Sequence, residues 1–291
     1  MRWRTLSFLF WVSSLLIVLL ATVLASLGGS HSVSSTMGGR LSALFGQTGN
    51  PSQPLEQLRQ VAELITVKIL SGEVLGSGII VHKKGAVYVV LTNAHVLRAA
   101  SPPYQIQTQD GKIYPAEMSQ VVSFKDNDLA LLEFYSSKAV YQVADLDTSL
   151  TKGEEVFAAG FPFSAEQSYT PVFSPTDIDD RGFAIRRGEV SLILNKALKG
   201  GYQIGYTSRV EKGMSGGPLL NHLGKVIAVN GMHAEPLWGD PYEFMDGSLP
   251  ESALKEQLSQ YSWGIPITTF QKLAIPTLQA KHSQSEGRGI R

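Results

Sequence analysis

The sequence contains no cysteine, which excludes disulfide bonds, zinc–thiolate sites and cysteine nucleophiles. It also lacks a net charge, because 25 lysines and arginines balance 25 aspartates and glutamates. Nucleic-acid-binding proteins usually carry a basic excess or a basic face, so we expect no nucleic-acid partner. No zinc-peptidase or phosphate-loop pattern occurs, and we expect no cofactor and no metal site. The acidic run 177–180 lacks the spacing of a calcium loop and is better interpreted as a polar turn.

Charge is also absent from one long N-terminal stretch. After the basic start at Arg2 and Arg4, the run from Leu6 to Leu27 is uncharged and apolar, and it reaches the roughly 20 residues that a membrane-spanning helix needs. The small-residue pattern of residues 23–25 resembles a signal-peptidase site, so residues 1–27 are either a transmembrane anchor or a cleaved signal peptide. Both interpretations predict export: the rest of the chain lies on the extracytoplasmic side, tethered to the membrane through the N-terminal helix, or is secreted.

The remaining chain divides into three parts. Residues 28–54 are rich in glycine, serine and threonine and predict a flexible linker. Residues 55–276 predict one globular domain, and residues 277–291 a polar C-terminal tail that frays near its end. The domain begins with apolar residues at helical spacing from Leu55 to Ile65.

Short strands dominate the rest of the domain. Roughly ten or more apolar runs, separated by glycine-rich turns and accompanied by few helices, predict an all-β sandwich or barrel. The clearest runs are 65–70, 78–81, 86–91, 129–134, 155–159, 188–194, 203–207, 225–229 and 263–267.

Three segments carry candidate catalytic groups. His95 follows an apolar strand within TNAHV (92–96), and Asp128 precedes another within NDLAL (127–131). Ser215 lies among glycines in GMSGGP (213–218), where the backbone can approach a substrate closely. Each feature alone has an ordinary structural interpretation, as a satisfied histidine, a turn cap or a tight turn. Together they supply the base, the orienting acid and the nucleophile of a serine hydrolase.

These three motifs resemble those of trypsin-like (chymotrypsin-fold) serine peptidases, and most closely the cysteine-free bacterial branch with the HtrA-type proteases. The resemblance covers about residues 65–275, and the set of three motifs is highly specific. It implies an all-β fold of two antiparallel six-stranded β-barrels with the catalytic cleft between them. It also implies a serine endopeptidase that hydrolyses peptide bonds of protein or peptide substrates through an acyl-enzyme. His95 would be the general base, Asp128 its orienting acid and Ser215 the nucleophile, and the backbone N–H groups of Gly213 and Ser215 would form the oxyanion hole.

The chain also departs from the family pattern. Met214 stands where trypsin has an aspartate that pairs with a newly cut N-terminus, so activation by that ion pair is not expected. A PDZ domain is not expected after the protease domain, because the chain ends soon after Phe270.

The resemblance further suggests substrate-binding residues. Arg209, six residues before the serine, matches the base of the primary pocket and would suit an acidic side chain. Val229, Asn230 and Gly231 would form the edge strand that pairs with substrate, and Gly264 matches a pocket-wall glycine. The segment 233–262 carries six acidic residues, which would favour basic substrates by long-range attraction, or it is a solvated insertion with a short helix at 252–258.

Two other functions are compatible with these residues. The segment 213–217 satisfies the nucleophile-elbow pattern of α/β-hydrolases, although Pro218 and the strand 225–229 leave little room for the helix that this fold requires. The domain could also be a catalytically idle peptide-binding module that keeps the fold without the activity.

Overall fold

The computed structural model describes residues 52–163, 182–233 and 242–286. The predicted anchor or signal segment 1–27 lies outside these residues, as do the linker up to residue 51 and the acidic run 177–180. Among the described residues, no helix is both long and apolar enough to cross a membrane.

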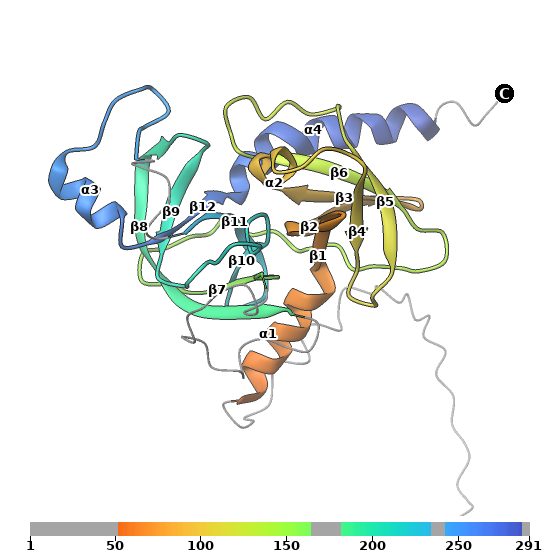
Figure 1. Ribbon diagram of the computed structural model, residues 1–291, viewed down its shortest axis with the longest axis horizontal. Coiled ribbons are helices and arrows are strands. Elements are labelled where there is room, and N and C mark those ends of the chain that lie inside the picture. The colour runs from red at the N-terminus through yellow and green to blue at the C-terminus, as the bar shows by residue number, and fades with distance from the viewer. Residues whose placement is uncertain (1–51, 164–181, 234–241, 287–291) are drawn as a thin grey trace, which may run out of the picture. The chain divides into compact units, whose positions relative to one another are not determined.

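The first barrel is closed by six antiparallel strands in the order β1-β2-β3-β6-β5-β4 (Figure 1). Pairing of β1 with β4 completes the closure, with Ile69 opposite Ile106. Its interior is apolar and aromatic, and the Tyr88 ring stacks on Phe134. The strands are β1 (Thr66–Ser71), β2 (Glu73–Lys84), β3 (Val87–Thr92), β4 (Tyr104–Gln107), β5 (Ile113–Met118) and β6 (Ala130–Tyr135).

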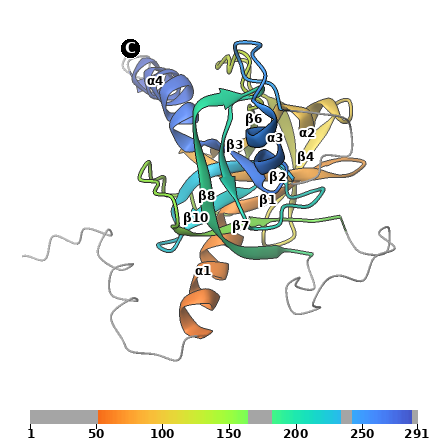
Figure 2. The same ribbon diagram turned by 90° about the vertical axis from the view of Figure 1, so that its left-hand side faces the viewer.

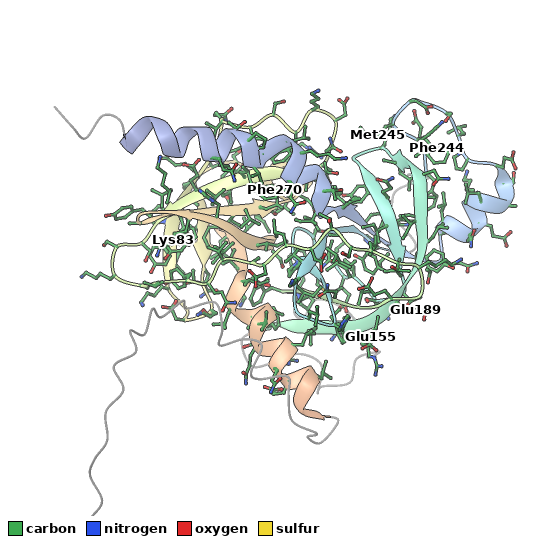
Figure 3. All side chains as sticks on the ribbon, turned by 180° about the vertical axis from the view of Figure 1, so that it is seen from behind. Lys83, Glu155, Glu189, Phe244, Met245 and Phe270 are labelled. Atoms are coloured by element: carbon green, nitrogen blue, oxygen red, sulfur yellow. The ribbon has the colours of Figure 1, made fainter. Side chains whose placement is uncertain are left out.

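The second barrel is also closed and antiparallel, in the order β10-β11-β12-β9-β8-β7. Glu155 and Glu189, labelled in Figure 3, lie opposite each other on β7 and β8. The strands are β7 (Glu155–Gly160), β8 (Ala184–Leu198), β9 (Tyr202–Tyr206), β10 (Pro218–Asn221), β11 (Val226–Met232) and β12 (Ser262–Pro266). The prediction of two six-stranded antiparallel barrels is therefore confirmed.

Besides the interiors of the barrels, a separate apolar cluster lies between them and joins them. It combines outward-facing residues of the first barrel, such as Leu91 and Leu131, with Phe157 and Trp263 of the second. Because burial of apolar surface drives their association, the barrels are docked rather than merely tethered. The candidate catalytic segments lie at this junction.

Four helices complete the described chain: α1 (Ser52–Ile65), α2 (Ala94–Arg98), α3 (Ser252–Leu258) and α4 (Ile267–Glu286). Figure 2 shows α1 and α4 at opposite ends of the barrel pair. The predicted helix from Leu55 to Ile65 is confirmed, and it starts at Ser52, so the end of the predicted linker is helical. Helix α3 confirms the short helix expected at 252–258.

The larger part of the predicted tail 277–291 is helical, since α4 continues to Glu286. Phe270, Ala274 and Leu278 recur at helical spacing and are buried, and Phe270 is labelled in Figure 3. This apolar stripe holds the helix onto the domain, although Pro276 lies inside it. Of the three, only Leu278 lies within the predicted tail.

The fold rules out the α/β-hydrolase alternative. Ser215 is followed by strand β10, which pairs with β7 and β11. A nucleophile elbow requires a helix directly after the serine and a largely parallel sheet before it. All named strand pairs between described residues are antiparallel.

Candidate active site

His95 is held just after a strand whose last five residues are buried. The side chains of β3 are buried up to Thr92 and Asn93, and the chain then turns into the short helix α2. His95 stands in the first turn of that helix, with 38% of its side chain exposed. The ring is thus fixed on its backbone side and open to the solvent on the other.

Asp128 binds His95 with both carboxylate oxygens. The Oδ1 atom accepts the backbone N–H of His95 at 2.8 Å, and Oδ2 lies 2.5 Å from the ring Nδ1. Two further donors reach the carboxylate: the Arg98 guanidinium at 3.3 Å from Oδ1 and the Tyr202 hydroxyl at 2.6 Å from Oδ2. Burial would raise the pKa of Asp128, but the hydrogen bonds from His95 and Tyr202 together hold it below its ordinary value. The carboxylate is therefore charged at neutral pH and faces the imidazole.

The backbone segments that carry His95 and Asp128 are also joined by hydrogen bonds. The carbonyl oxygen of Asp128 accepts the Asn93 side-chain amide at 2.9 Å and the N–H of Ala94 at 3.2 Å. Asn93 is fully buried. With the side-chain contacts to His95, these bonds fix the segment before α2 against the segment before β6.

The Ser215 loop reaches the first barrel through its glycines. Gly213 and Gly216 have φ of 92° and 84°, a backbone conformation that side chains rarely adopt. A Cβ at 213 would collide with the Phe161 carbonyl, and one at 216 with Thr92 at the end of β3. Glycine is required here by conformation and by space. The turn carries Ser215 to the end of the strand that leads into His95.

Ser77 on β2 fastens this loop to the first barrel. Its hydroxyl donates to the carbonyl of Gly213 at 2.7 Å and accepts the N–H of Phe161 at 2.9 Å. Its backbone N–H donates to the carbonyl of Ser215 at 2.9 Å. Ser77 is fully buried, so these bonds form without competition from water.

Met214 anchors the same loop in the second barrel. Its side chain is fully buried in an apolar cluster with Val156, Val210 and Leu219. The position that carries an ion-pairing aspartate in trypsin is here held by apolar packing, which needs no newly cut N-terminus.

Two backbone donors of the loop have no partner among the described residues. The N–H of Met214 is used internally by the carbonyl of Glu211 at 3.0 Å. The N–H groups of Gly213 and Ser215, on either side of it, donate to no described group. This arrangement suits the binding of an oxyanion.

The hydroxyl of Ser215 donates to the carbonyl of Gly231 at 3.2 Å. No hydrogen bond joins it to His95 within the described part of the chain. The structure therefore contains a formed His95–Asp128 pair and a separately oriented serine. Catalytic hydrogen bonds are often long or open before a substrate binds.

The predicted substrate-binding residues differ in their surroundings. Arg209 is exposed, between buried Ser208 and Val210, so the structure does not enclose it. Val229 pairs with Pro218 of β10 and Ile265 of β12 in the sheet of the second barrel.

The backbone and side-chain polar groups of Asn230 all form hydrogen bonds within the protein. Its backbone bonds to Gly216 and Gly217, and its side chain bonds to Tyr206, Ala159 and Pro218. Gly231, next to it, is the serine's acceptor, and Gly264 packs against Ala228 and Tyr206. None of these contacts tests the predicted substrate roles, which stay predictions.

A cavity of about 630 Å³ opens beside Asp128. It is lined from both barrels, by Arg98 of α2, Lys125 of the loop before β6, Lys199 after β8 and Met245, which Figure 3 labels. Asp128 is among the residues that line this cavity, whereas His95 and Ser215 are not.

The described part of the acidic insertion is partly neutralised. Glu243 pairs with Lys199 and Asp246 with Lys196, each at 2.6 Å. These pairs reduce the long-range field that would attract basic substrates, and favour the interpretation of 233–262 as a solvated insertion.

With the geometry established, comparison with known proteins identifies the family. A family model described as a trypsin-like peptidase domain matches residues 76–229, a segment that includes His95, Asp128 and Ser215. The chain belongs to the trypsin-like peptidase family. This agrees with the two barrels and with the resemblance of the three motifs.

Curated relatives of this trypsin-like peptidase are named "Serine protease HTRA2, mitochondrial". The protein of Drosophila virilis is 26% identical over 208 residues, which are 70% of this chain and 46% of the relative. That of Drosophila erecta is 27% identical over the same shares. The chain therefore matches less than half of the length of these relatives.

Sequence reasoning missed four residues of this trypsin-like peptidase's site. Tyr202 and Arg98 contact Asp128, and Ser77 holds the serine loop. Half-buried His233 lies near His95, and burial followed by the charges of Lys212 and His95 lowers its pKa. Only Ser77 had a sequence signal, because glycines on both sides of it within a strand indicate a close approach of backbone.

Proposed function

We propose that the chain is a serine endopeptidase that hydrolyses peptide bonds through an acyl-enzyme. The observation that carries the proposal is the carboxylate of Asp128, which binds both the backbone N–H and the ring of His95. A buried carboxylate in this position fixes the imidazole tautomer whose other nitrogen can accept a proton, and it stabilises the imidazolium that forms.

The proposed reaction begins when Ser215 Oγ turns from the Gly231 carbonyl toward Nε2 of His95. The hydroxyl oxygen attacks the scissile carbonyl carbon while its proton passes to His95. The N–H groups of Gly213 and Ser215 bind the oxyanion, and His95 then gives the proton to the leaving amine. Water attacks the acyl-enzyme by the same route and regenerates Ser215.

A fluorophosphonate probe tests this proposal, because it reacts with activated serines and leaves ordinary hydroxyls alone. We expect the purified full chain to form one covalent adduct, which peptide mass spectrometry locates on Ser215. The His95→Ala variant should label far more slowly. A folded wild-type chain that forms no adduct would instead identify the idle peptide-binding module.

We further propose that the N-terminal segment exports the chain and tethers it to the membrane. The proposal rests on the uncharged run from Leu6 to Leu27 and the preceding arginines. Expressed in a bacterium, the intact chain should stay in the membrane pellet after carbonate extraction. A mature form starting after Ala25 would show that the segment is a cleaved signal, and an intact chain in the cytosol would contradict both versions.

A further inference from the structure

Tyr202 lies at the point where the second barrel meets the candidate acid. It is the first residue of β9, directly after the turn that joins β8 to β9. Only 7% of the residue is exposed. Its hydroxyl is 2.6 Å from Oδ2 of Asp128, the same oxygen that contacts the His95 ring.

The hydroxyl of Tyr202 acts as the donor in this contact. Burial, together with the neighbouring charge of Asp128, raises the pKa of Tyr202 well above its ordinary value of 10.0. The phenol therefore keeps its proton, and the charged carboxylate beside it accepts. Hydrogen bonds to a charged group are the stronger kind.

The backbone holds these two side chains in register. The N–H of Asp128 donates to the carbonyl of Gly200 at 2.8 Å, and Asn127 forms a parallel bridge with the same glycine. A Cβ at Gly201 would collide with the Asn127 side chain, so the turn lies directly on the segment that carries the acid.

The ring of Tyr202 also contacts the serine side of the site. It covers Gly231, where a Cβ would collide with the phenol. The carbonyl of Gly231 is the acceptor for the Ser215 hydroxyl. One side chain thus touches both the carboxylate that binds His95 and the residue that binds Ser215.

We propose that Tyr202 is a positioning residue of the hydrolytic reaction, which fixes the Asp128 carboxylate against the His95 ring from the second barrel. The inference rests on the proposed function. Asp128 is otherwise faced by His95 and Arg98, with Lys125 and Lys199 along the adjoining cavity. Among the described side chains bonded to it, Tyr202 alone comes from the second barrel.

The test is Tyr202→Phe, which removes the hydroxyl and keeps the ring over Gly231. We expect kcat for a peptide substrate to fall about tenfold with KM nearly unchanged. The acidic limb of the pH–rate profile should move to higher pH, because the carboxylate then favours the protonated imidazole more strongly. The matched control is Tyr88→Phe, which removes a buried hydroxyl bonded to the Tyr141 N–H inside the first barrel and should change neither value.

Two more measurements separate positioning from a merely structural role. In an Asp128→Asn background, Tyr202→Phe should cause no further loss, because a residue that acts through Asp128 has nothing left to position. Replacing Tyr202 by 3-fluorotyrosine, a stronger donor of nearly the same shape, should move the acidic limb the opposite way. Additive losses, or a Tyr202→Phe profile identical to that of Tyr88→Phe, would overturn the inference.

A carbon-13 NMR titration measures the pKa of Asp128 and does not depend on catalytic activity. It therefore distinguishes a failure of the positioning role from a failure of the proposed function. Loss of the Tyr202 bond should raise the pKa of Asp128, because that bond helps to lower it. If the wild type is inactive and the pKa rises, the proposed function fails and the positioning contact stands. If the wild type is active and the variant changes neither the pKa nor kcat, the positioning role fails and the function stands.

Discussion

Replacement of Ser215 by alanine is expected to lower kcat for peptide hydrolysis by roughly 10⁴-fold to 10⁶-fold. The change removes the attacking oxygen itself, so no remaining group can form the acyl-enzyme. The hydroxyl makes one weak contact, to the Gly231 carbonyl at 3.2 Å, and the loop is held by Ser77 and Met214 instead. The thermal unfolding midpoint should therefore stay close to that of the wild type.

Ser136→Ala is the matched control for this variant. Its hydroxyl also donates to a backbone carbonyl, that of Ala139 at 2.9 Å, but it lies in the first barrel away from the catalytic groups. The Ser136→Ala variant should retain the wild-type kcat. A Ser215→Ala protein that still cleaves peptides within tenfold of the wild-type rate would show that another group is the nucleophile.

Asp128→Asn is expected to lower kcat by about 10⁴-fold. An asparagine amide can present its NH₂ group to Nδ1 of His95, which selects the tautomer that cannot accept the serine proton. Asp126→Asn is the same chemical change two residues earlier, at an exposed position, and should keep kcat within about twofold. Equal losses in the two variants would mean that Asp128 is not the orienting acid.

The stability of Asp128→Asn should depend on pH in a defined direction. The pKa of Asp128 is lowered in the folded chain from an ordinary value of 3.8, by hydrogen bonds from His95 and Tyr202 that outweigh burial. Such a group contributes stability above the unfolded pKa, and this contribution is lost as the pH falls through the folded pKa. Melting curves of the two proteins should differ most near neutral pH and converge below about pH 3.8. A constant difference would contradict this.

The catalytic candidates could be predicted from the sequence because each lies in a short motif whose local structure explains the residue. His95 follows a buried strand, Asp128 precedes one, and Ser215 lies among glycines that only a tight, closely packed turn requires. The strand pattern predicted only an all-β sandwich or barrel, whereas the resemblance of the three motifs to a known family implied two barrels with these residues between them. The sequence predicted that Asp128 orients His95, and the structure supplied the contacts that both carboxylate oxygens make with it.

The residues that support the site could not be predicted in the same way. Tyr202 and Ser77 lie within strands and acquire their contacts only when the barrels dock. Of the two, only Ser77 had a local sequence signal, in the glycines on both sides of it. The strands β4, β5 and β10 were missed for local reasons. Strand β4 has only two buried positions, β5 contains Pro115 and buries only Ala116, and β10 begins at Pro218.

The bonds of Ser77 and Tyr202 have a consequence for how the chain is made. Each crosses from one barrel to the other, so a chain with only its first barrel folded lacks the Ser77 bonds to the serine loop and the Tyr202 bond to the Asp128 carboxylate. Cleavage competence would then arise in a single step, when the second barrel closes and docks. Under the proposed function, a newly made chain would therefore lack hydrolytic activity until its second barrel has formed.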